Sequence, residues 1–213
     1  TIFSSSNAQY WKELRSIPPA YINNYWLDVY FHPSNSNYGW VCGFQGMIIR
    51  TTDGGNSWSG SQIAGVNHLE HVNFPSLTVG YTSGPDGIYK STNGGQSWVD
   101  VTPNNFISYW GCYFVDENVG LVLAEGCNDQ QRFYRTSDGG QTWTLFTGTE
   151  PASGLTDLIL YDANGLGFAA SSCRIWRTLD GGTTWSVFSS SGTKVWNEEK
   201  KKKNSSFLVP YAG

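Results

Sequence analysis

Apolar and polar residues alternate along the chain in short runs, and turn-forming residues separate these runs. The runs are rich in β-branched and aromatic residues, as in "WLDVYF" at 26–31 and "MIIRTT" at 47–52. Alternation with a period of two is typical of β-strands that bury one face. No stretch of useful length carries the helical period, so the pattern predicts an all-β fold.

The runs come in groups of four. A nine-residue motif begins near the end of the third run of each group. It joins Arg or Lys to an Asp-Gly-Gly or Asn-Gly-Gly turn and ends in Trp, and its copies occupy 50–58, 90–98, 135–143 and 177–185. The closing tryptophans are 40, 45 and 42 residues apart. A fixed period of this length indicates a repeat architecture. Four short strands per repeat are typical of a β-propeller blade.

The residues of the motif predict its local structure. Asp-Gly or Asn-Gly between strands favours a tight turn, because glycine adopts positive φ without strain. The Asp or Asn side chain accepts hydrogen bonds from nearby amides, so either residue should keep the turn. The Trp should fill the space between layers. The predicted structural residues are Asp53, Trp58, Asn93, Trp98, Asp138, Trp143, Asp180 and Trp185.

These motifs resemble Asp-boxes, also called BNR repeats, with the pattern Ser/Thr-x-Asp-x-Gly-x-Ser/Thr-Trp. Three copies match fully, and "STNGGQSW" departs only at Asn93. The run "GWVCGFQGMIIRTTDGGNSW" at 39–58 resembles the photosystem II assembly-factor class of BNR propellers, and Asp-boxes also occur in sialidase-superfamily propellers. The resemblance implies the propeller fold and implies little about the ligand.

We predict one domain, a five-bladed β-propeller of four-stranded antiparallel blades. The complete blades are predicted at about 19–63, 64–103, 104–147 and 152–190. The fifth is predicted to combine 194–213 with 1–16, where Trp11 closes a degenerate box, and this closure would pair the sheet edges. Four lysines at 200–203 do not suit an apolar inner strand. The alternative is a fragment of a larger propeller with six to eight blades, within a longer protein.

Composition narrows the classes of partner and location. Only 14% of the 213 residues are charged and the net charge is −4, which does not favour nucleic acid as a partner. No apolar run is long enough for membrane insertion. The chain begins without Met or a signal peptide, so we expect a mature or excised domain. High Ser, Thr, Asn, Gly and aromatic content suits a secreted, periplasmic or cell-surface protein.

The four cysteines show no metal-ligand spacing, and no metal or cofactor is predicted. Cys42 and Cys112 lie within predicted strands and should be buried. Cys127 and Cys173 fall near equivalent turns of adjacent blades, which makes them candidates for a disulfide in an oxidising compartment.

Ligands of propellers usually bind at the channel mouth and at the loops that link blades or join the second and third strands of a blade, which we call the loop face. The binding candidates there are Tyr25, Trp26, His68, Tyr109, Trp110, Asp157 and Trp196. The aromatic members could instead fill the space between blades. His68 and His71 should point to opposite faces of a strand, so no shared metal site is predicted. Asp28, His71 and Asp157 are expected to be hydrated groups of the channel.

Basic residues recur at the first position of each motif, as Arg50, Lys90, Arg135 and Arg177. One interpretation is a solvated or ion-paired position with a packed aliphatic stem. The other is a cationic patch for an acidic partner, which the resemblance to assembly-factor propellers allows.

Three classes of function stay open. The favoured one is a non-catalytic, extracytoplasmic binding or scaffold propeller that recognises a protein or peptide through its loop face. A lectin-like module would use the same aromatic residues to bind a glycan. A sialidase-like glycoside hydrolase is the third class, and ordinary glycoside hydrolysis needs two opposed carboxylates. Nothing in the sequence selects such a pair.

Overall fold

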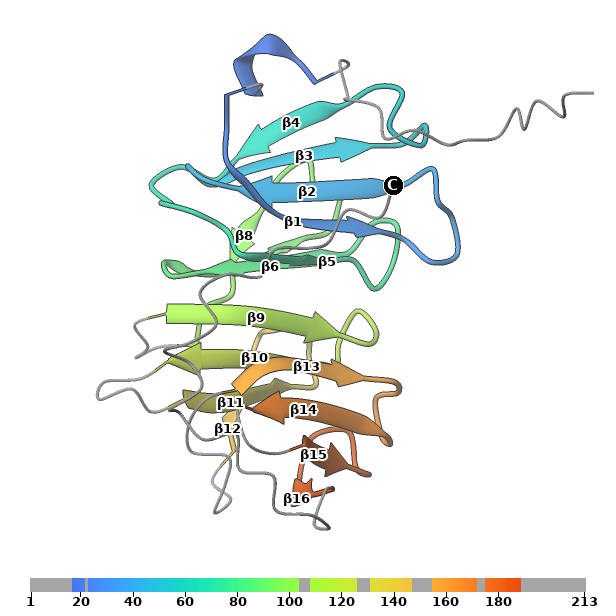
Figure 1. Cartoon of the computed structure of the whole chain (residues 1–213), viewed down its shortest axis with the longest axis vertical. Helices are drawn as coiled ribbons and strands as arrows, with labels where there is room; N and C mark the ends of the chain where they lie inside the picture. The colour runs from blue at the N-terminus through green and yellow to red at the C-terminus, as the bar shows by residue number, and fades with distance from the viewer. Residues whose placement is uncertain are drawn as a thin grey trace, which may run out of the picture.

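The computed structural model describes residues 17–21, 23–103, 108–125, 131–146, 155–171 and 175–188. These residues form four antiparallel sheets of four strands, and in each sheet the spatial order of the strands follows the sequence (Figure 1). We call the sheets blades 1 to 4 in chain order. The predicted all-β fold and the four-stranded antiparallel blades are confirmed for these four repeats.

Blades 1 and 2 occupy the first half of the described chain. A short 3-10 turn, η1 (Pro19–Tyr21), precedes them. Blade 1 contains β1 (Trp26–Phe31), β2 (Gly39–Gly43), β3 (Met47–Thr51) and β4 (Ser59–Gln62). Blade 2 contains β5 (His71–Asn73), β6 (Gly80–Gly84), β7 (Gly87–Ser91) and β8 (Val99–Asp100).

Blades 3 and 4 repeat this arrangement. Blade 3 contains β9 (Ser108–Phe114), β10 (Gly120–Glu125), β11 (Gln131–Thr136) and β12 (Thr144–Leu145). Blade 4 contains β13 (Leu155–Leu160), β14 (Gly167–Ser171), β15 (Ile175–Thr178) and β16 (Ser186–Val187). The fourth strand of each blade is shorter than the apolar run that predicted it, because the hydroxyl residue and Trp at the start of that run belong to the Asp-box turn.

Several predictions fall outside the described residues. They are the fifth blade from 194–213 and 1–16, the lysines at 200–203, Trp196 and the disulfide between Cys127 and Cys173. Within the described ranges, no helix has the length and apolar character needed to cross a membrane.

Each Asp-box is a hydrogen-bonded turn between the third and fourth strands. In blade 1, Thr51 Oγ1 donates to Asp53 Oδ1 at 2.8 Å and accepts from the amide of Gly55 at 2.9 Å. Asp53 in turn accepts from the amide and the hydroxyl of Ser57, at 2.9 and 2.5 Å. Gly54 and Gly55 have φ of 71° and 88°, a region that favours glycine. The same bonds recur around Asp138 and Asp180.

Asn93 preserves this turn in blade 2, as predicted. Its Oδ1 accepts from the amide of Ser97 and from the hydroxyl of Ser91, each at 3.0 Å. Its Nδ2 donates to Ser97 Oγ at 2.8 Å. The Ser97 hydroxyl is therefore an acceptor here, whereas the equivalent Ser57 hydroxyl donates to a carboxylate.

The core lies mainly between neighbouring blades. Trp40 of blade 1 stacks on Phe74 of blade 2, with ring centroids 3.7 Å apart and an interplanar angle of 6°. Tyr81 of blade 2 stacks in the same way on Phe114 of blade 3, at 3.4 Å and 1°. At the third junction the equivalent residues are leucines, which belong to one buried cluster. They are Leu121 of blade 3 and Leu160 of blade 4.

Three of the four Asp-box tryptophans, Trp98, Trp143 and Trp185, contact the preceding blade, whereas Trp58 packs on Phe31 of its own blade. Trp143 Nε1 donates to the carbonyl of Val101, next to β8 of the preceding blade, at 2.8 Å. Trp185 stacks on Phe133 of blade 3, with centroids 5.3 Å apart. The box therefore shapes a turn and also supplies an anchor between blades.

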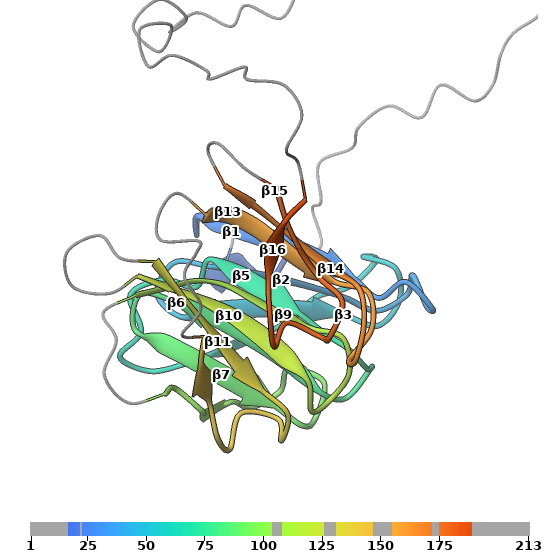
Figure 2. The ribbon, with the colours of Figure 1, turned by 90° about the horizontal axis from the view of Figure 1, so that it is seen from below.

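The four blades form an arc around their innermost strands, β1, β5, β9 and β13. Figures 1 and 2 show these strands next to one another, and consecutive members are in contact. In Figure 1, blade 1 extends upward from β1 to β4, whereas blade 4 extends downward from β13 to β16. The first and last blades therefore stand at opposite ends of the arc.

Candidate functional site

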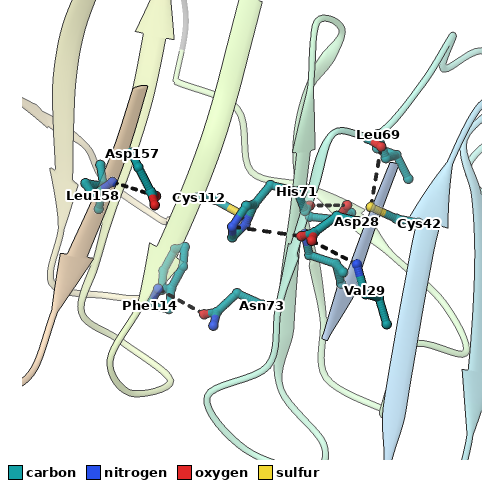
Figure 3. Close-up of polar contacts among 12 residues, drawn as sticks. Asp28, Val29, Cys42, Leu69, His71, Asn73, Cys112, Phe114, Asp157 and Leu158 are labelled. Carbon is teal, nitrogen blue, oxygen red and sulfur yellow. Dashed lines mark hydrogen bonds and ion pairs between the residues drawn. The ribbon is translucent and has the colours of Figure 1, made fainter. Parts of the chain in front are cut away.

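Polar side chains link the innermost strands of neighbouring blades (Figure 3). Asp28 Oδ2 on β1 accepts from the amide of Val72 on β5 at 2.9 Å. Asn73 Oδ1 on β5 accepts from the amide of Phe114 on β9 at 3.0 Å. Backbone amides that point away from their own sheet thereby gain partners, as buried donors require. Asp28 therefore links two strands. The sequence predicts only that Asp28 is a hydrated group of the channel.

His71 lies between a carboxylate and a thiol (Figure 3). Its Nε2 is 3.9 Å from Asp28 Oδ2, and its Nδ1 is 3.8 Å from Cys112 Sγ. Cysteine, histidine and aspartate in this order are the groups of a nucleophilic site. Burial, however, raises the pKa of Cys112 to about 12, so the thiol stays protonated near neutral pH. The arrangement therefore has the chemistry of a packed link between blades and lacks an activated nucleophile.

Cys42 and Cys112 are both buried and free, as predicted. Cys42 Sγ donates to the carbonyl of Leu69 at 3.4 Å. Burial raises the pKa of Cys42 well above its usual value. Both thiols therefore behave as small apolar residues of the junctions.

The repeated basic residues bridge to the following blade. Arg50 Nη1 donates to Gly94 O at 3.3 Å, Lys90 Nζ to Gly139 O at 3.1 Å, and Arg135 Nε to Gly181 O at 2.9 Å. Each acceptor is the carbonyl of the first glycine in the Asp-box of the next blade. The partner is thus a backbone carbonyl, which neither sequence interpretation anticipated. Three of the four basic residues hold blades together.

Arg177 in blade 4 differs from the other three basic residues. Its guanidinium lies over the ring of Phe188, 5.1 Å from the centroid. Its Nε is buried and has no hydrogen-bond partner among the described residues. The other three basic residues each contact the following blade. The described residues contain no blade after blade 4 for Arg177 to contact.

Three rings form a continuous row on the loop face, which we call the aromatic row: Tyr25, Phe44 and His68. The centroids of Tyr25 and Phe44 are 5.5 Å apart, and those of Phe44 and His68 are 5.2 Å apart with an interplanar angle of 20°. Tyr25 is 75% exposed and Phe44 is 40% exposed. The row therefore offers ring surface to a ligand in solution.

Main-chain bonds hold the aromatic row in place. The amide of Phe44 donates to the carbonyl of Tyr25 at 2.9 Å, and Asn24 Nδ2 donates to the carbonyl of Phe44 at 3.0 Å. Phe44 and His68 also form an isolated antiparallel bridge between the two blades. Glu70 Oε1 lies 3.0 Å from His68 Nε2 and orients that ring. The backbone that carries these rings therefore needs little reordering when a ligand binds.

Comparison with known proteins identifies the family. The model of the family described as photosynthesis system II assembly factor YCF48 matches residues 4–173. The chain belongs to this family. A photosystem II assembly lipoprotein Ycf48 from Synechococcus sp. (strain CC9902) is 27% identical over 139 residues, which cover 62% of this chain and 39% of the relative. The chain spans less than two fifths of the length of the curated relatives it matches.

Solved structures share the propeller fold of this YCF48-family chain. The structure of YCF48 bound to D1 peptide aligns with a TM-score of 0.59 at 21% identity, over 80% of this chain and 56% of that chain. An ancestral GH74 enzyme aligns with a TM-score of 0.62 at 16% identity, over 73% of this chain and 25% of the enzyme. Likeness at these identities shows the fold alone. The family match over residues 4–173 confirms the predicted resemblance to assembly-factor propellers.

The other candidates of the YCF48-family chain occupy different surroundings. Trp110 on β9 is 48% exposed, and Trp26 is half-buried. Asp157 is exposed, and its Oδ1 accepts a hydrogen bond from the amide of Leu158 at 2.8 Å (Figure 3). Tyr109 is only 1% exposed and belongs to the core cluster between blades 2 and 3. It therefore leaves the set of binding candidates, because a ligand has no access to its ring.

The structure also changes the prediction for the two histidines. β5 begins at His71, so His68 precedes the strand and does not occupy its opposite face. His68 pairs with Glu70, whereas His71 faces Asp28. Among the described residues, no group of three or more His, Cys, Asp or Glu side chains is placed to hold a metal ion.

Phe44 and Glu70 are the site residues that sequence reasoning missed. Phe44 ends the apolar run at 39–44, and the structure ends β2 at Gly43, so Phe44 lies just beyond the strand. The available signal was the following pair, Gln45 and Gly46, which adopt φ of 58° and 65° and turn the chain outward. A residue beside such a turn on the loop face is a candidate for contact with a ligand.

Proposed function

We propose that this YCF48-family protein is a non-catalytic propeller that binds an extended peptide of a partner protein through its loop face. The observation that carries the proposal is the aromatic row, which is exposed and held in place by main-chain bonds. The relative whose structure is described as YCF48 bound to D1 peptide supports a peptide as the class of ligand. The activity remains a proposal for this chain, which covers 56% of that relative.

The chemistry of the aromatic row suits apolar and aromatic side chains of a peptide. Stacked or edge-on ring pairs contribute about 0.5–1.5 kcal/mol each beyond the area that they bury. The carboxylate of Glu70 lies next to His68 and can accept a hydrogen bond from a peptide amide or a basic side chain. Trp110 is exposed on β9, and we propose that its ring is a further contact for the peptide.

We further propose an extracytoplasmic location. The Synechococcus relative is described as a lipoprotein, and lipid anchoring of that kind supports a protein held at a membrane surface. The low charged fraction of this chain, 14%, is in keeping with that setting.

The architecture of the complete ring is also a proposal. Closure into five blades, with the fifth from 194–213 and 1–16, would use the two terminal segments. The alternative is that the four blades belong to a larger propeller. The opposite directions of blades 1 and 4 and the greater length of the relatives support this alternative.

The test is binding of the D1 peptide and of a phage-displayed random peptide library to the 213-residue chain. We expect Phe44→Ala to weaken peptide binding about tenfold, because it removes the central ring of the row. Val99→Ala is the matched control, since Val99 is 68% exposed on β8, outside the row. Failure to select any peptide, or equal affinity of Phe44→Ala and wild type, would overturn the proposal. Binding on a glycan array without peptide binding would favour a lectin-like module instead.

A further inference from the structure

The junction between blades 3 and 4 lacks the ring stack that fills the other two junctions. At the second junction, Tyr81 stacks on Phe114 with ring centroids 3.4 Å apart. Leu121 and Leu160 stand in the equivalent positions of the third junction, and both are buried. Two leucine side chains fill less volume than two rings at the same positions, so the third junction has room for a further group.

The Asp-box tryptophan of blade 4 also differs from its equivalents. Trp143 Nε1 donates across the second junction to the carbonyl of Val101 at 2.8 Å, and Trp98 donates across the first junction in the same way. Trp185 Nε1 instead donates to the carbonyl of Gly182 in its own box at 3.2 Å. The hydrogen bond of this indole therefore stays within blade 4 and does not bridge the third junction.

A cavity of about 470 Å³ lies at the third junction. Sites that bind small molecules typically measure about 300–1,000 Å³. The apolar part of the lining comes from blade 3, and the Asp-box of blade 4 forms the rim. Both blades lie within the described residues, so the cavity is not an outer face of the arc. Its apolar lining residues are Leu121, Phe133, Leu145 and Phe146.

The lining of this cavity suits an aromatic ring. Phe133 stacks on Trp185 with centroids 5.3 Å apart, and it meets Phe146 edge-on at 6.4 Å and 70°. Aromatic rings prefer offset or edge-on neighbours at these separations. A planar ring in the cavity would therefore extend an aromatic cluster that is already present.

Two hydroxyl groups at the rim can accept a hydrogen bond from a ligand. Thr183 Oγ1 donates to the carbonyl of Asp180 at 2.9 Å, and Thr184 Oγ1 donates to Asp180 Oδ2 at 2.6 Å. A hydroxyl that has donated its proton keeps lone pairs for use as an acceptor. Both threonines line the cavity. The rim therefore suits a ring that carries an O–H group.

Arg135 places a cation at the same cavity. Its guanidinium group lines the space, and its Nε donates to the carbonyl of Gly181 at 2.9 Å. Lys90 occupies the equivalent position of the second junction and lies 5.4 Å from the centroid of the Tyr81 ring. A cation and a ring thus already meet at that junction. A ligand ring beside Arg135 would restore this contact at the third.

We propose that the cavity between blades 3 and 4 binds a small phenolic molecule. The ring packs against Leu121 and Phe146 beside the guanidinium of Arg135, and the phenol hydroxyl donates to Thr183 or Thr184. The site shares no residue with the aromatic row and does not depend on a peptide. It therefore stands apart from the proposed function.

The experiment uses 4-fluorophenol as the probe and follows its binding to the 213-residue chain by fluorine NMR. We expect saturable binding with a dissociation constant on the order of 1 mM, as suits so small a ligand. Phenol should displace the probe. Cyclohexanol has a similar size and a hydroxyl group but no aromatic ring, so it should compete about threefold to tenfold less well.

Thr144→Trp tests the position of the site. Thr144 is exposed where it lines the cavity, so an indole there should cover the entrance and weaken binding of the probe about tenfold or more. Val99→Trp is the matched control, because Val99 pairs with Lys90 as Thr144 pairs with Arg135, and it is also exposed. This control should bind the probe like wild type.

Leu121→Phe tests the same space from within. The ring should fill the cavity, weaken binding of the probe to a similar degree and raise the melting temperature, because it restores an aromatic residue at the junction. Thr144→Trp decides the test if Leu121→Phe does not fold. No saturable binding to wild type up to about 10 mM would overturn the proposal. Equal competition by phenol and cyclohexanol, or equal affinity of Thr144→Trp and wild type, would also overturn it.

Discussion

Lys90 of blade 2 reaches across a junction and donates to the carbonyl of Gly139, the first glycine of the Asp-box in blade 3, at 3.1 Å. The two residues are separated by 49 positions in the chain. The ammonium group also lies 5.4 Å from the centroid of the Tyr81 ring. The Asp-box thus has a second role beyond its own turn, because it presents an acceptor to the preceding blade.

Removal of this donor should destabilise the junction between blades 2 and 3. We expect Lys90→Ala to lower the free energy of unfolding by about 1.5–3 kcal/mol, the usual range for a hydrogen bond with a charged partner. Urea denaturation followed by tryptophan fluorescence measures the change. Lys90→Arg is the control and should be near neutral, since Arg50 and Arg135 occupy the equivalent positions. Equal stability of Lys90→Ala and wild type would contradict this role.

The Asp-box carboxylates should make the protein sensitive to acid. Hydrogen bonds from the hydroxyl and the amide of Ser57, followed by one from Thr51, lower the pKa of Asp53 from its usual 3.8 to about 2. A folded-state pKa below the unfolded value means that the ionised group stabilises the fold above about pH 4 and that this contribution is lost as pH falls toward 2. The pKa of Asp138 is lowered by the same kind of bonds, from Thr142. Burial raises the pKa of Asp180, but the bonds from Thr184 outweigh it and lower the pKa.

Asp53→Asn tests this contribution with little change in shape. Asn93 keeps the turn of blade 2 with an amide, so the variant should be nearly as stable as wild type near neutral pH. Its urea midpoint should fall less than that of wild type between about pH 4 and pH 2. Asn93→Asp should have the opposite effect and add acid sensitivity. Identical pH profiles for all three proteins would show that the box carboxylate contributes nothing through its pKa.

Much of the fold is predictable because each blade carries its own local signals. The Asp-Gly-Gly turns, the alternating runs and the period of the tryptophans locate the strands without knowledge of their neighbours. The partners across the junctions are not predictable in this way. The alternation of a strand separates its two faces, but it does not say that Arg50 meets Gly94, 44 residues away.

The candidate site is less predictable for the same reason. Tyr109 and Trp110 are adjacent aromatic residues, and the register of β9 against β10 shifts at this point, where Tyr109 pairs with Ala124 and Gly111 pairs with Leu123. A bulge of this kind re-aims side chains. The sequence therefore does not reveal that Tyr109 enters the junction while Trp110 stays exposed. Tyr25 and Phe44 become neighbours because β1 and β2 pair with Trp26 opposite Gly43, and the sequence does not fix that register.

The ring stack between blades 2 and 3 should tolerate a smaller apolar partner but not its removal. Phe114 is 2% exposed and stacks on Tyr81. Phe114→Ala should cost about 3–5 kcal/mol, because it leaves a cavity in a packed junction. Phe114→Leu should cost about half as much or less, since Leu160 occupies the equivalent position in blade 4. Thermal and urea unfolding measure both variants, and similar losses for the two would mean that the stack depends on ring geometry.

The buried thiols should be unreactive in the native protein. Burial raises the pKa of Cys112 to about 12, and burial also raises that of Cys42, so little thiolate is present near neutral pH. The experiment uses the variant Cys127→Ser/Cys173→Ser, which leaves only these two thiols. We expect their reaction with a disulfide reagent to be slower than in urea by on the order of a hundredfold or more. Fast labelling of the native variant would mean that the junctions around β1, β5 and β9 open readily, and a Cys112→Ala comparison would identify which junction opens.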